Sequence, residues 1–262
     1  MKNKLTIVKV GGLIINDDSL IKVFLENFSK IDGKKIMVHG GGNIASNYMR
    51  RLGIDPKMIN GRRITDLETL DIAMMTYAGL INKKIVAKLQ QLNCNALGLS
   101  GADGNIIKSK IREFKEIDFG FVGDIICIND QLILKLLDSK LVPILCSLSH
   151  DGAGQILNTN ADSIASSLAI EMSKHFDVTL KYCFDKPGLL TDINKPDSIK
   201  KHIIKSDYEK LKKDRIIVDG MIPKIESCFF ALENGVKEIF IGNQNIINDV
   251  KNCTKITLSW KK

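Results

Sequence analysis

Three consecutive glycines, at positions 40–42, stand between a short apolar run over 36–38 and a segment with helical spacing over 44–52. Glycine costs backbone entropy on folding, so three of them at a strand-to-helix turn are typical of backbone N–H groups that approach an anion closely. The dipole of the following helix would favour the same anion. A tight turn without a ligand is the simpler interpretation, but such a turn needs fewer glycines.

The triplet is not a P-loop, because no Gly-Lys-Ser or Gly-Lys-Thr follows it. Gly40, Gly42 and Ala45 match the loose dinucleotide-binding pattern, but that pattern belongs at the first strand of a fold. A different pair, Gly11 and Gly12, ends the first predicted strand. Two glycine-rich strand ends predict two anionic groups that are held near each other.

Two lysines stand where a positive charge is unfavourable unless it meets an anion. Lys9 lies inside the apolar strand predicted over Leu5–Val10, where an uncompensated cation is costly to bury. Lys224 follows Pro223 in the first turn of a predicted helix and faces the positive end of its dipole. A bound phosphate would make both positions favourable. The alternatives are an outward-pointing strand lysine and a solvent-facing helix lysine.

Polar side chains gather in the segment over 158–162, directly before another predicted helix. One Asn or Asp at such a place is an ordinary N-cap. Asn158, Asn160 and Asp162 together indicate contacts with a substrate and a carboxylate that orients a lysine.

Arg63 is a candidate for binding a carboxylate, because a guanidinium can donate two parallel hydrogen bonds. It lies in a hairpin predicted over 57–64, with Asn60-Gly61 as the turn. A surface arginine of the hairpin is the alternative interpretation, and Arg62 beside it is the better candidate for that role.

The elements that must position these residues alternate between strands and helices. Nearly continuous apolar runs predict strands over 5–10, 35–38, 96–99, 142–147, 178–184, 238–242 and 255–259. Helical spacing predicts helices over 19–28, 43–52, 67–92, 131–138, 160–176, 207–212 and 221–234, the long one capped by Asp66. Strands and turns are expected over 106–128, and a polar loop over 186–205. The alternation predicts an α/β fold, a three-layer αβα sandwich with a mainly parallel central sheet, divided near Asp177.

Composition limits the function classes. The chain has 262 residues, 44% of them hydrophobic, which is enough for a core in one large domain or two lobes. Its net charge of +8 comes from scattered lysines without interleaved aromatics, which favours a solvated surface over a nucleic-acid interface. The six cysteines form no C-x-x-C pair and are expected to be buried free thiols, and the four histidines lack metal-ligand spacing. Without a signal peptide or an apolar run of membrane length, a cytoplasmic protein is expected.

Together these motifs resemble the amino acid kinase family and, within it, the acetylglutamate kinase branch. The resemblance covers essentially the whole chain and rests on the order and spacing of segments at 9–12, 39–42, 60–65, 158–162 and 219–224. They read Lys-Val-Gly-Gly, His-Gly-Gly-Gly, Asn-Gly-Arg-Arg-Ile-Thr, Asn-Thr-Asn-Ala-Asp and Asp-Gly-Met-Ile-Pro-Lys. The uridylate kinase branch shares the glycine triplet but not the third and fourth segments in this form. The set is specific, whereas any single segment is not.

The resemblance implies transfer of the γ-phosphoryl group of ATP to the γ-carboxylate of an N-acylated glutamate, a step of arginine biosynthesis. The residues that would bind the acylated glutamate are Gly41, Gly42, Arg63, Asn158 and Asn160. The catalytic residues would be Lys9, Lys224 and Asp162, of which Asp162 orients the lysines. The site for ATP with Mg²⁺ would include Gly11, Gly12, Asp185 and Gly188. Phosphoryl transfer needs positioning and charge neutralisation rather than a covalent nucleophile, and glycines and lysines supply both.

By the same resemblance, residues 1–177 would form the acylglutamate-binding and dimerisation lobe and residues 178–262 the ATP-binding lobe. The family often has Thr-Asp-Val-x-Gly where this chain has Phe-Asp-Lys-Pro-Gly at 184–188. The alternatives are a nucleotide-binding regulator that has lost catalysis, a kinase for glutamate, aspartate or uridylate, and a dehydrogenase. Intact Lys9, Lys224 and Asp162 argue against the inactive regulator.

Two finer expectations concern assembly and substrate. Only four residues precede the first strand, too few for the N-terminal helix that links dimers of arginine-inhibited members, so a homodimer without arginine feedback is expected. In the long helix, Ile72, Met75, Gly79, Leu80 and Ile85 form either a dimer face or simple core.

The segment over 182–186 resembles a branch with an N-succinyl pathway. The extra carboxylate of a succinyl group needs a further cation, for which Arg62 and Lys57 are nearest in sequence.

Overall fold

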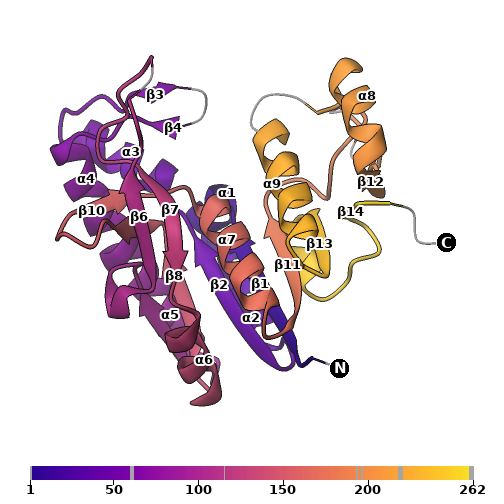
Figure 1. Ribbon diagram of the computed structural model, residues 1–262, viewed down its shortest axis with the longest axis horizontal. Helices are drawn as coiled ribbons and strands as arrows, with labels where there is room; N and C mark the ends of the chain where they lie inside the picture. Colours follow the sequence, from indigo (N-terminus) through magenta and orange to yellow (C-terminus); the bar gives the residue numbers. More distant parts are fainter. Residues whose placement is uncertain are drawn as a thin grey trace.

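The computed structural model describes residues 2–59, 62–114, 116–192, 194–195, 197–217 and 221–259. A single eight-stranded sheet runs through this part of the molecule (Figure 1). Its strands, in spatial order, are β12 (His202–Ile204), β14 (Thr254–Thr257), β13 (Glu238–Gly242), β11 (Asp177–Cys183), β1 (Lys4–Val10), β2 (Lys34–His39), β8 (Val142–Cys146) and β5 (Ala96–Leu99). All neighbours run parallel except β13 and β14. The predicted, mainly parallel sheet is therefore confirmed.

Helices cover both faces of this sheet and complete the three predicted layers. The first hydrophobic cluster, called here the α7-side cluster, includes α6 (Asp130–Asp138), α7 (Ala161–Ser173), α8 (Tyr208–Lys213) and α9 (Met221–Glu233). The second, the α2-side cluster, includes α1 (Gly12–Asn16), α2 (Asp18–Ser29), α3 (Gly42–Arg51) and the long helix over 67–91.

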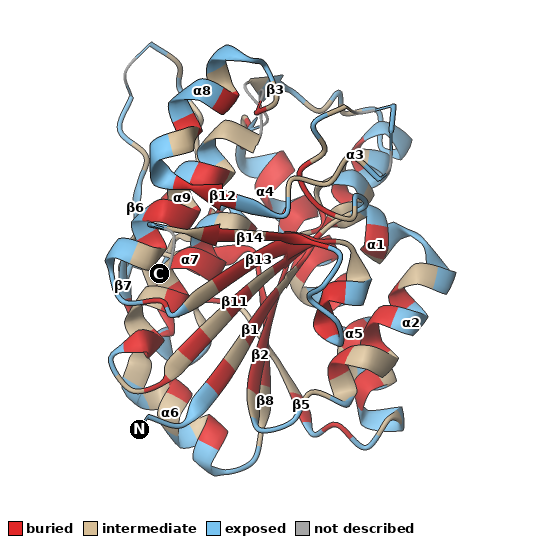
Figure 2. Cartoon of the chain, turned by 90° about the vertical axis from the view of Figure 1, so that its right-hand side faces the viewer, coloured by how far each residue is buried: buried red, intermediate tan, exposed pale blue. Residues whose placement is uncertain are grey.

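Strand β1 shows how the sequence separates the two clusters. Leu5 and Ile7 belong to the α7-side cluster, and Val8 and Val10 to the α2-side cluster. Successive side chains of a strand point to opposite faces, so a strand buried on both faces is apolar throughout. The central strands are accordingly buried along much of their length (Figure 2).

Smaller sheets lie beside the amino-terminal half of the main sheet (Figure 1). One has four strands in the order β10 (Ile156–Asn158), β9 (Leu148–His150), β6 (Ile107–Ile111) and β7 (Gly123–Ile128). The hairpin predicted over 57–64 is present as β3 (Met58–Ile59) paired with β4 (Arg62–Arg63). Its predicted turn, Asn60-Gly61, lies outside the described residues.

The long helix is continuous, but its middle is not α-helical. It consists of α4 (Leu67–Met74), the π-helix η1 (Met75–Ile81) and α5 (Asn82–Gln91). Asp66 caps it as predicted, because its Oδ1 accepts a hydrogen bond of 2.9 Å from the amide of Thr69. The π-helix changes the register along the helix: Ile72 and Ile85 are buried in the core, whereas Met75 is 60% exposed. The helix therefore does not present one common face formed by Ile72, Met75, Gly79, Leu80 and Ile85.

Three other expectations need correction. The predicted polar loop over 186–205 contains β12, a strand too short to show an apolar run, which pairs with β14. Gly12 is the first residue of the short helix α1 rather than the end of the first strand. All six cysteines are free, but Cys127 is exposed.

The remaining connections include three 3₁₀ turns, which are η2 (Asp103–Asn105), η3 (Lys205–Asp207) and η4 (Gln244–Ile247). Within the described ranges, no helix combines the length and the apolar character needed to cross a membrane.

Candidate active site

Lys9, Asp162 and Lys224 meet although they are far apart in the sequence. Lys9 follows Leu5 and Ile7 on one face of β1, Asp162 lies in the first turn of α7, and Lys224 in the first turn of α9. The Nζ of Lys9 is 2.8 Å from Oδ1 of Asp162, and the Nζ of Lys224 is 3.6 Å from Oδ2. Each lysine side chain is only 14% exposed.

The electrostatics of this trio keep the carboxylate ionised. Burial alone raises the pKa of Asp162, but the positive charges of Lys9 and Lys224 outweigh that effect, so the pKa lies below its ordinary value. One carboxylate between two ammonium groups leaves an excess of positive charge. The trio can therefore attract an anion.

A pocket beside the lysines could receive such an anion. Its lining consists of Lys9, Val10, Gly11, Gly12, Leu13, Gly40, Gly41, Gly42, Asn43, Phe184, Asp185 and Lys224. Because β1 and β2 are parallel neighbours, their glycine-rich ends emerge at the same edge of the sheet. We call this cavity the phosphate pocket.

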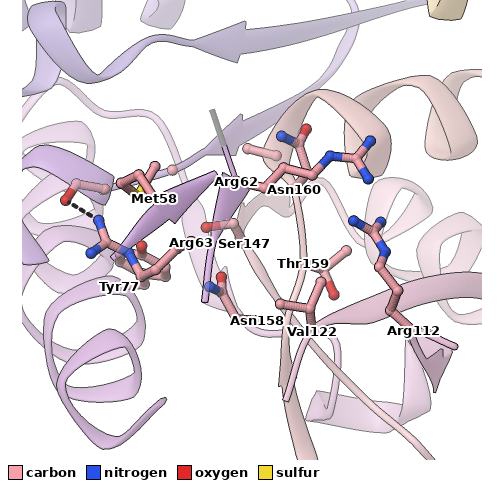
Figure 3. Close-up of a pocket in the computed structure, with 14 residues that line it drawn as sticks. Met58, Arg62, Arg63, Tyr77, Arg112, Val122, Ser147, Asn158, Thr159 and Asn160 are labelled. Carbon is pink, nitrogen blue, oxygen red and sulfur yellow. Dashed lines mark hydrogen bonds between the residues drawn. The ribbon is translucent and has the colours of Figure 1, made fainter. Parts of the chain in front are cut away.

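A second pocket shares the glycine triplet with the first (Figure 3). Besides Gly40, Gly41 and Gly42, it is lined by Met58, Arg62, Arg63, Tyr77, Arg112, Val122, Ser147, Asn158, Thr159, Asn160 and Ala161. We call it the acceptor pocket. The same loop of three glycines thus forms part of the wall of both cavities.

Arg63 is fixed in the wall of the acceptor pocket. It is 7% exposed, and one terminal guanidinium nitrogen donates to the carbonyl of Gly42 at 2.9 Å and to Oγ of Ser46 at 2.8 Å. The other terminal nitrogen contacts the sulfur of Met49 at 3.3 Å. Figure 3 shows its guanidinium apart from those of Arg62 and Arg112, on the opposite side of the view.

Two asparagines of the acceptor pocket also have internal partners. Asn158 donates from Nδ2 to Oγ1 of Thr65 at 3.0 Å. Asn160 caps α7, because its Oδ1 accepts from the amides of Asp162 and Ser163 at 2.8 and 3.1 Å. Its oxygen is therefore used by the helix, and its amide nitrogen is the part that could meet a ligand.

The glycine triplet is anchored from behind. A Cβ on Gly41 would lie 2.3 Å from Cδ1 of Ile81 and 2.7 Å from Cδ1 of Tyr77, so only glycine fits against the π-helix. His39, fully buried before the triplet, donates from Nδ1 to the carbonyl of Gly40 at 2.8 Å. Its Nε2 accepts from Nδ2 of Asn82 at 3.0 Å, a tautomer consistent with the pKa of His39, which burial lowers to about 4.

Gly188 lies elsewhere. It lines neither of the two pockets just described, and a Cβ there would come within 2.7 Å of Oγ1 of Thr254. Close packing on β14 therefore explains this glycine without a ligand. Lys181 precedes the Phe-Asp-Lys-Pro-Gly segment and Lys186 lies within it. Lys181 donates to the carbonyls of Ile246 and Ile247, both at 2.9 Å, and Lys186 lies 3.7 Å from Asp185.

Several residues of the acceptor pocket were not identified from the sequence. The motifs considered above include neither Tyr77, inside the long helix, nor Ser147, at the end of a predicted strand, and they include Thr159 only as part of the segment 158–162. Arg112 comes from the loop after β6 and pairs with Asp124, whose two oxygens each lie 3.2 Å from its Nε. One terminal nitrogen of Arg112 is buried without a partner among the described residues.

Comparisons with known proteins agree with this geometry. The model of the amino acid kinase family matches residues 4–243. A protein of Bacteroides thetaiotaomicron named acetylglutamate kinase is 47% identical over 249 residues, which is 95% of this chain and 97% of that protein. A protein of the same name from Methanopyrus kandleri is 36% identical, with coverages of 90% and 94%. A crystal structure of a Streptococcus mutans protein superposes with a TM-score of 0.79 at 26% identity, covering 97% of this chain and 99% of that one. The chain belongs to the amino acid kinase family.

Proposed function

We propose that this chain is an acetylglutamate kinase, which transfers the γ-phosphoryl group of ATP to the γ-carboxylate of N-acetyl-L-glutamate in arginine biosynthesis. One observation carries the proposal: the glycines at 40–42 line the acceptor pocket and the phosphate pocket at once. A carboxylate that reaches this loop from one side meets a phosphoryl group that reaches it from the other. Both reactants can thus be held in contact, which is the main requirement of phosphoryl transfer.

The acceptor pocket supplies the groups that an acylated glutamate needs. Arg63 is a buried cation for the α-carboxylate, and Asn158 and Asn160 offer amides for the acyl-amide end. The backbone at Gly41 and Gly42 would hold the γ-carboxylate at the entrance to the phosphate pocket.

The phosphate pocket supplies the positive charge. In the transition state of phosphoryl transfer, negative charge is spread over the oxygens of the transferring group. Lys9 and Lys224 would stabilise this charge, and Asp162 would hold both ammonium groups in place before the reactants arrive.

ATP with Mg²⁺ is the phosphoryl donor in this proposal. The residues fit such a group: Gly11 and Gly12 line the pocket without side chains that would block a phosphate, and the partly exposed carboxylate of Asp185 would be an oxygen ligand for the metal ion. Bound Mg²⁺ would neutralise phosphate charge, and it normally takes most of its ligands from phosphates and water. In the described part of the chain, no three His, Cys, Asp or Glu residues are grouped to hold a metal ion.

The test is an ADP-release assay with N-acetylglutamate, glutamate, aspartate and uridylate as acceptors. Hydroxylamine, which traps acyl phosphates, identifies the product. N-acetylglutamate should be the substrate among these four. ATP binding without turnover of any acceptor would instead identify an inactive regulator, and binding of NADH but not ATP a dehydrogenase.

A second acceptor, N-succinyl-L-glutamate, is favoured by a specific feature of the pocket. Arg62 and Arg112 line it together with Arg63, and one buried nitrogen of Arg112 has no partner among the described residues. These cations could bind the additional carboxylate of a succinyl group. Arg62→Ala should then reduce kcat/KM for N-succinylglutamate more than for N-acetylglutamate, whereas an equal loss for both would contradict this assignment.

We also propose two lobes, residues 1–177 for binding the acceptor and residues 178–262 for binding the nucleotide. We propose in addition that two copies of the chain form a homodimer. Leu67, Met74 and Met75 are exposed on the long helix at 58%, 36% and 60%, which supports contact with a second copy there. Sedimentation of the protein and of a Met75→Glu variant would test the dimer. A wild-type monomer would contradict it.

A further inference from the structure

The ammonium group of Lys224 has aromatic neighbours as well as a carboxylate. Its Nζ lies 5.3 Å from the centroid of the Phe184 ring and 6.0 Å from that of the Tyr182 ring, both within the range of a cation–π interaction. Asp162 is 3.6 Å from Lys224 but 2.8 Å from Lys9. The shared carboxylate therefore binds Lys9 more closely, and the two rings supply much of the remaining environment of Lys224.

The strand places both rings on the same side of the sheet. Tyr182 lies in β11 and Phe184 directly after it, two positions apart, and both pack on the α7-side cluster. Cys183 between them belongs to the α2-side cluster. This is the alternation of a strand, continued one residue beyond its end.

Specific contacts fix the position of both rings. Tyr182 is 1% exposed, and its hydroxyl lies 2.6 Å from Oγ of Ser166 and donates to the carbonyl of Asp162 at 3.3 Å. Phe184 passes over Gly11, where a Cβ would lie 3.5 Å from Cα of Phe184 and 3.1 Å from the carbonyl of Cys183. The amide of Gly11 donates to that carbonyl at 2.8 Å.

We propose that Phe184, with Tyr182, is a positioning residue that holds the Lys224 ammonium for the phosphoryl group. This inference rests on the proposed function. Lys224 stands at the positive end of the α9 dipole and close to a second ammonium, so something must keep it in the pocket. A second carboxylate would do so but would also cancel the charge needed by the phosphate. An aromatic ring attracts the cation while it remains neutral, and the full positive charge stays available.

Kinetics of Phe184→Leu test the proposal, with Phe184→Tyr as the conservative control. Loss of the ring should lower kcat roughly 5- to 30-fold, the fold-change that corresponds to a cation–π contact. KM for the acceptor should not change, and Phe184→Tyr should keep most of kcat. In a Lys224→Met background, Phe184→Leu should cause no further loss. An unchanged kcat in Phe184→Leu, or an undiminished effect without Lys224, would overturn the proposal.

Two further measurements separate positioning from packing. Mono-, di- and trifluorinated phenylalanine at 184 weakens the ring's attraction for a cation with little change of shape, so kcat should fall stepwise while the melting temperature stays constant. This series also replaces Phe184→Leu if that variant does not fold. Equal kcat across the series would refute the cation–π contact.

The second measurement needs no turnover. Acetic anhydride labelling without nucleotide, followed by mass spectrometry, should modify Lys224 faster in Phe184→Leu than in the wild type, with Lys84 as internal reference. Equal labelling would count against the contact. If Lys224 were labelled faster in Phe184→Leu but the wild type transferred no phosphoryl group, the proposed function would be wrong. The contact between the two rings and Lys224 would still be supported.

Discussion

The acceptor pocket differs in construction from the region around Asp185 and Lys186, which the proposed function assigns to the nucleotide and which we call the nucleotide side. In the acceptor pocket, Arg63, Asn158 and Asn160 already have hydrogen-bond partners in the protein. On the nucleotide side, the side chains of Asp185 and Lys186 are 39% and 47% exposed. The Nζ of Lys186 lies 3.7 Å from Oδ2 of Asp185.

This difference indicates where specificity is fixed. Side chains held by internal hydrogen bonds lose little conformational freedom when a ligand arrives, so a rigid pocket discriminates between acceptors of similar shape. A phosphate chain with its metal ion brings charge of its own and can be held by backbone N–H groups and lysines. The nucleotide side can therefore tolerate unusual residues such as Lys186 at exposed positions.

The largest effects are expected at the junction of the two regions. Lys9→Met and Lys224→Met should each reduce kcat on the order of 10²–10³-fold, because each removes a preorganised charge from the transition state. KM for the acceptor should change much less, since the acceptor pocket is intact. The measurement is steady-state kinetics, with thermal melts to show that the variants fold. A folded variant with near-normal kcat would show that its lysine has no role in the reaction.

His39 tests how firmly the glycine loop is anchored. Burial lowers the pKa of His39 in the folded protein from its ordinary 6.5 to about 4, so the unfolded chain binds the proton first as pH falls. This contribution to stability is complete above about pH 6.5 and is lost between about 6.5 and 4, by at most roughly 3 kcal/mol. Protonation would also place an N–H of His39 opposite the Nδ2 donor of Asn82.

Urea unfolding between pH 4 and 8 measures this contribution. A His39→Gln variant should lose the part of the pH dependence that lies in this window. The same slope in both proteins would show that other groups cause it and that the anchor is weaker than the geometry indicates.

Among the kinetic constants, Arg63→Ala should change mainly KM for the acceptor. KM for the acylglutamate should rise about 10- to 100-fold with a smaller change in kcat, as expected for a charged hydrogen bond in the ground state. The free energy of unfolding should fall by about 1–3 kcal/mol, because partly buried partners such as Ser46 lose their donor. Arg62→Ala, an exposed change in the same hairpin, is the matched control and should leave stability unchanged. An unaltered acceptor KM in Arg63→Ala would remove the α-carboxylate from this position.

Asp185→Asn should have the smallest effect. A partly exposed carboxylate in a site where phosphates and water supply most magnesium ligands should change KM for MgATP about 3- to 10-fold. KM for the acceptor is the internal control and should stay constant. A loss as large as that of the lysine variants would break the comparison, because the nucleotide side would then depend on one fixed side chain.

The sequence predicted most of the sheet because its central strands contain nearly continuous apolar runs. It placed Lys9 in a strand and Lys224 at a helix start, and it singled out Asp162, whose carboxylate the structure sets between the two ammonium groups. Lys9 and Lys224 each conflict with their local environment, and such conflicts are visible in a single sequence.

Other features could not be predicted for physical reasons. The strand β12 has only three residues and depends on β14 for its hydrogen bonds. Arg112 and Tyr77 reach the acceptor pocket through tertiary structure, and no local pattern marks either of them. Gly188 was assigned to the nucleotide site from its motif, yet its close approach to Thr254 is enough to require glycine.

The π-helix at Met75–Ile81 has a consequence for how the chain can change in length. A π-helix contains one residue more than an α-helix needs for the same span, so deletion of one residue there, for example Gly79, would yield ordinary α-helical hydrogen bonds. Because the wide turn absorbs the extra residue, the deletion would leave α4 and α5 close to their present orientation about the helix axis. Tyr77 and Ile81 could then stay near Gly41 while Asn82 stays on His39. The helix should therefore tolerate the loss of one residue within Met75–Ile81, whereas a deletion in α4, where the spacing is α-helical, would turn one part of the helix against the other by about 100°.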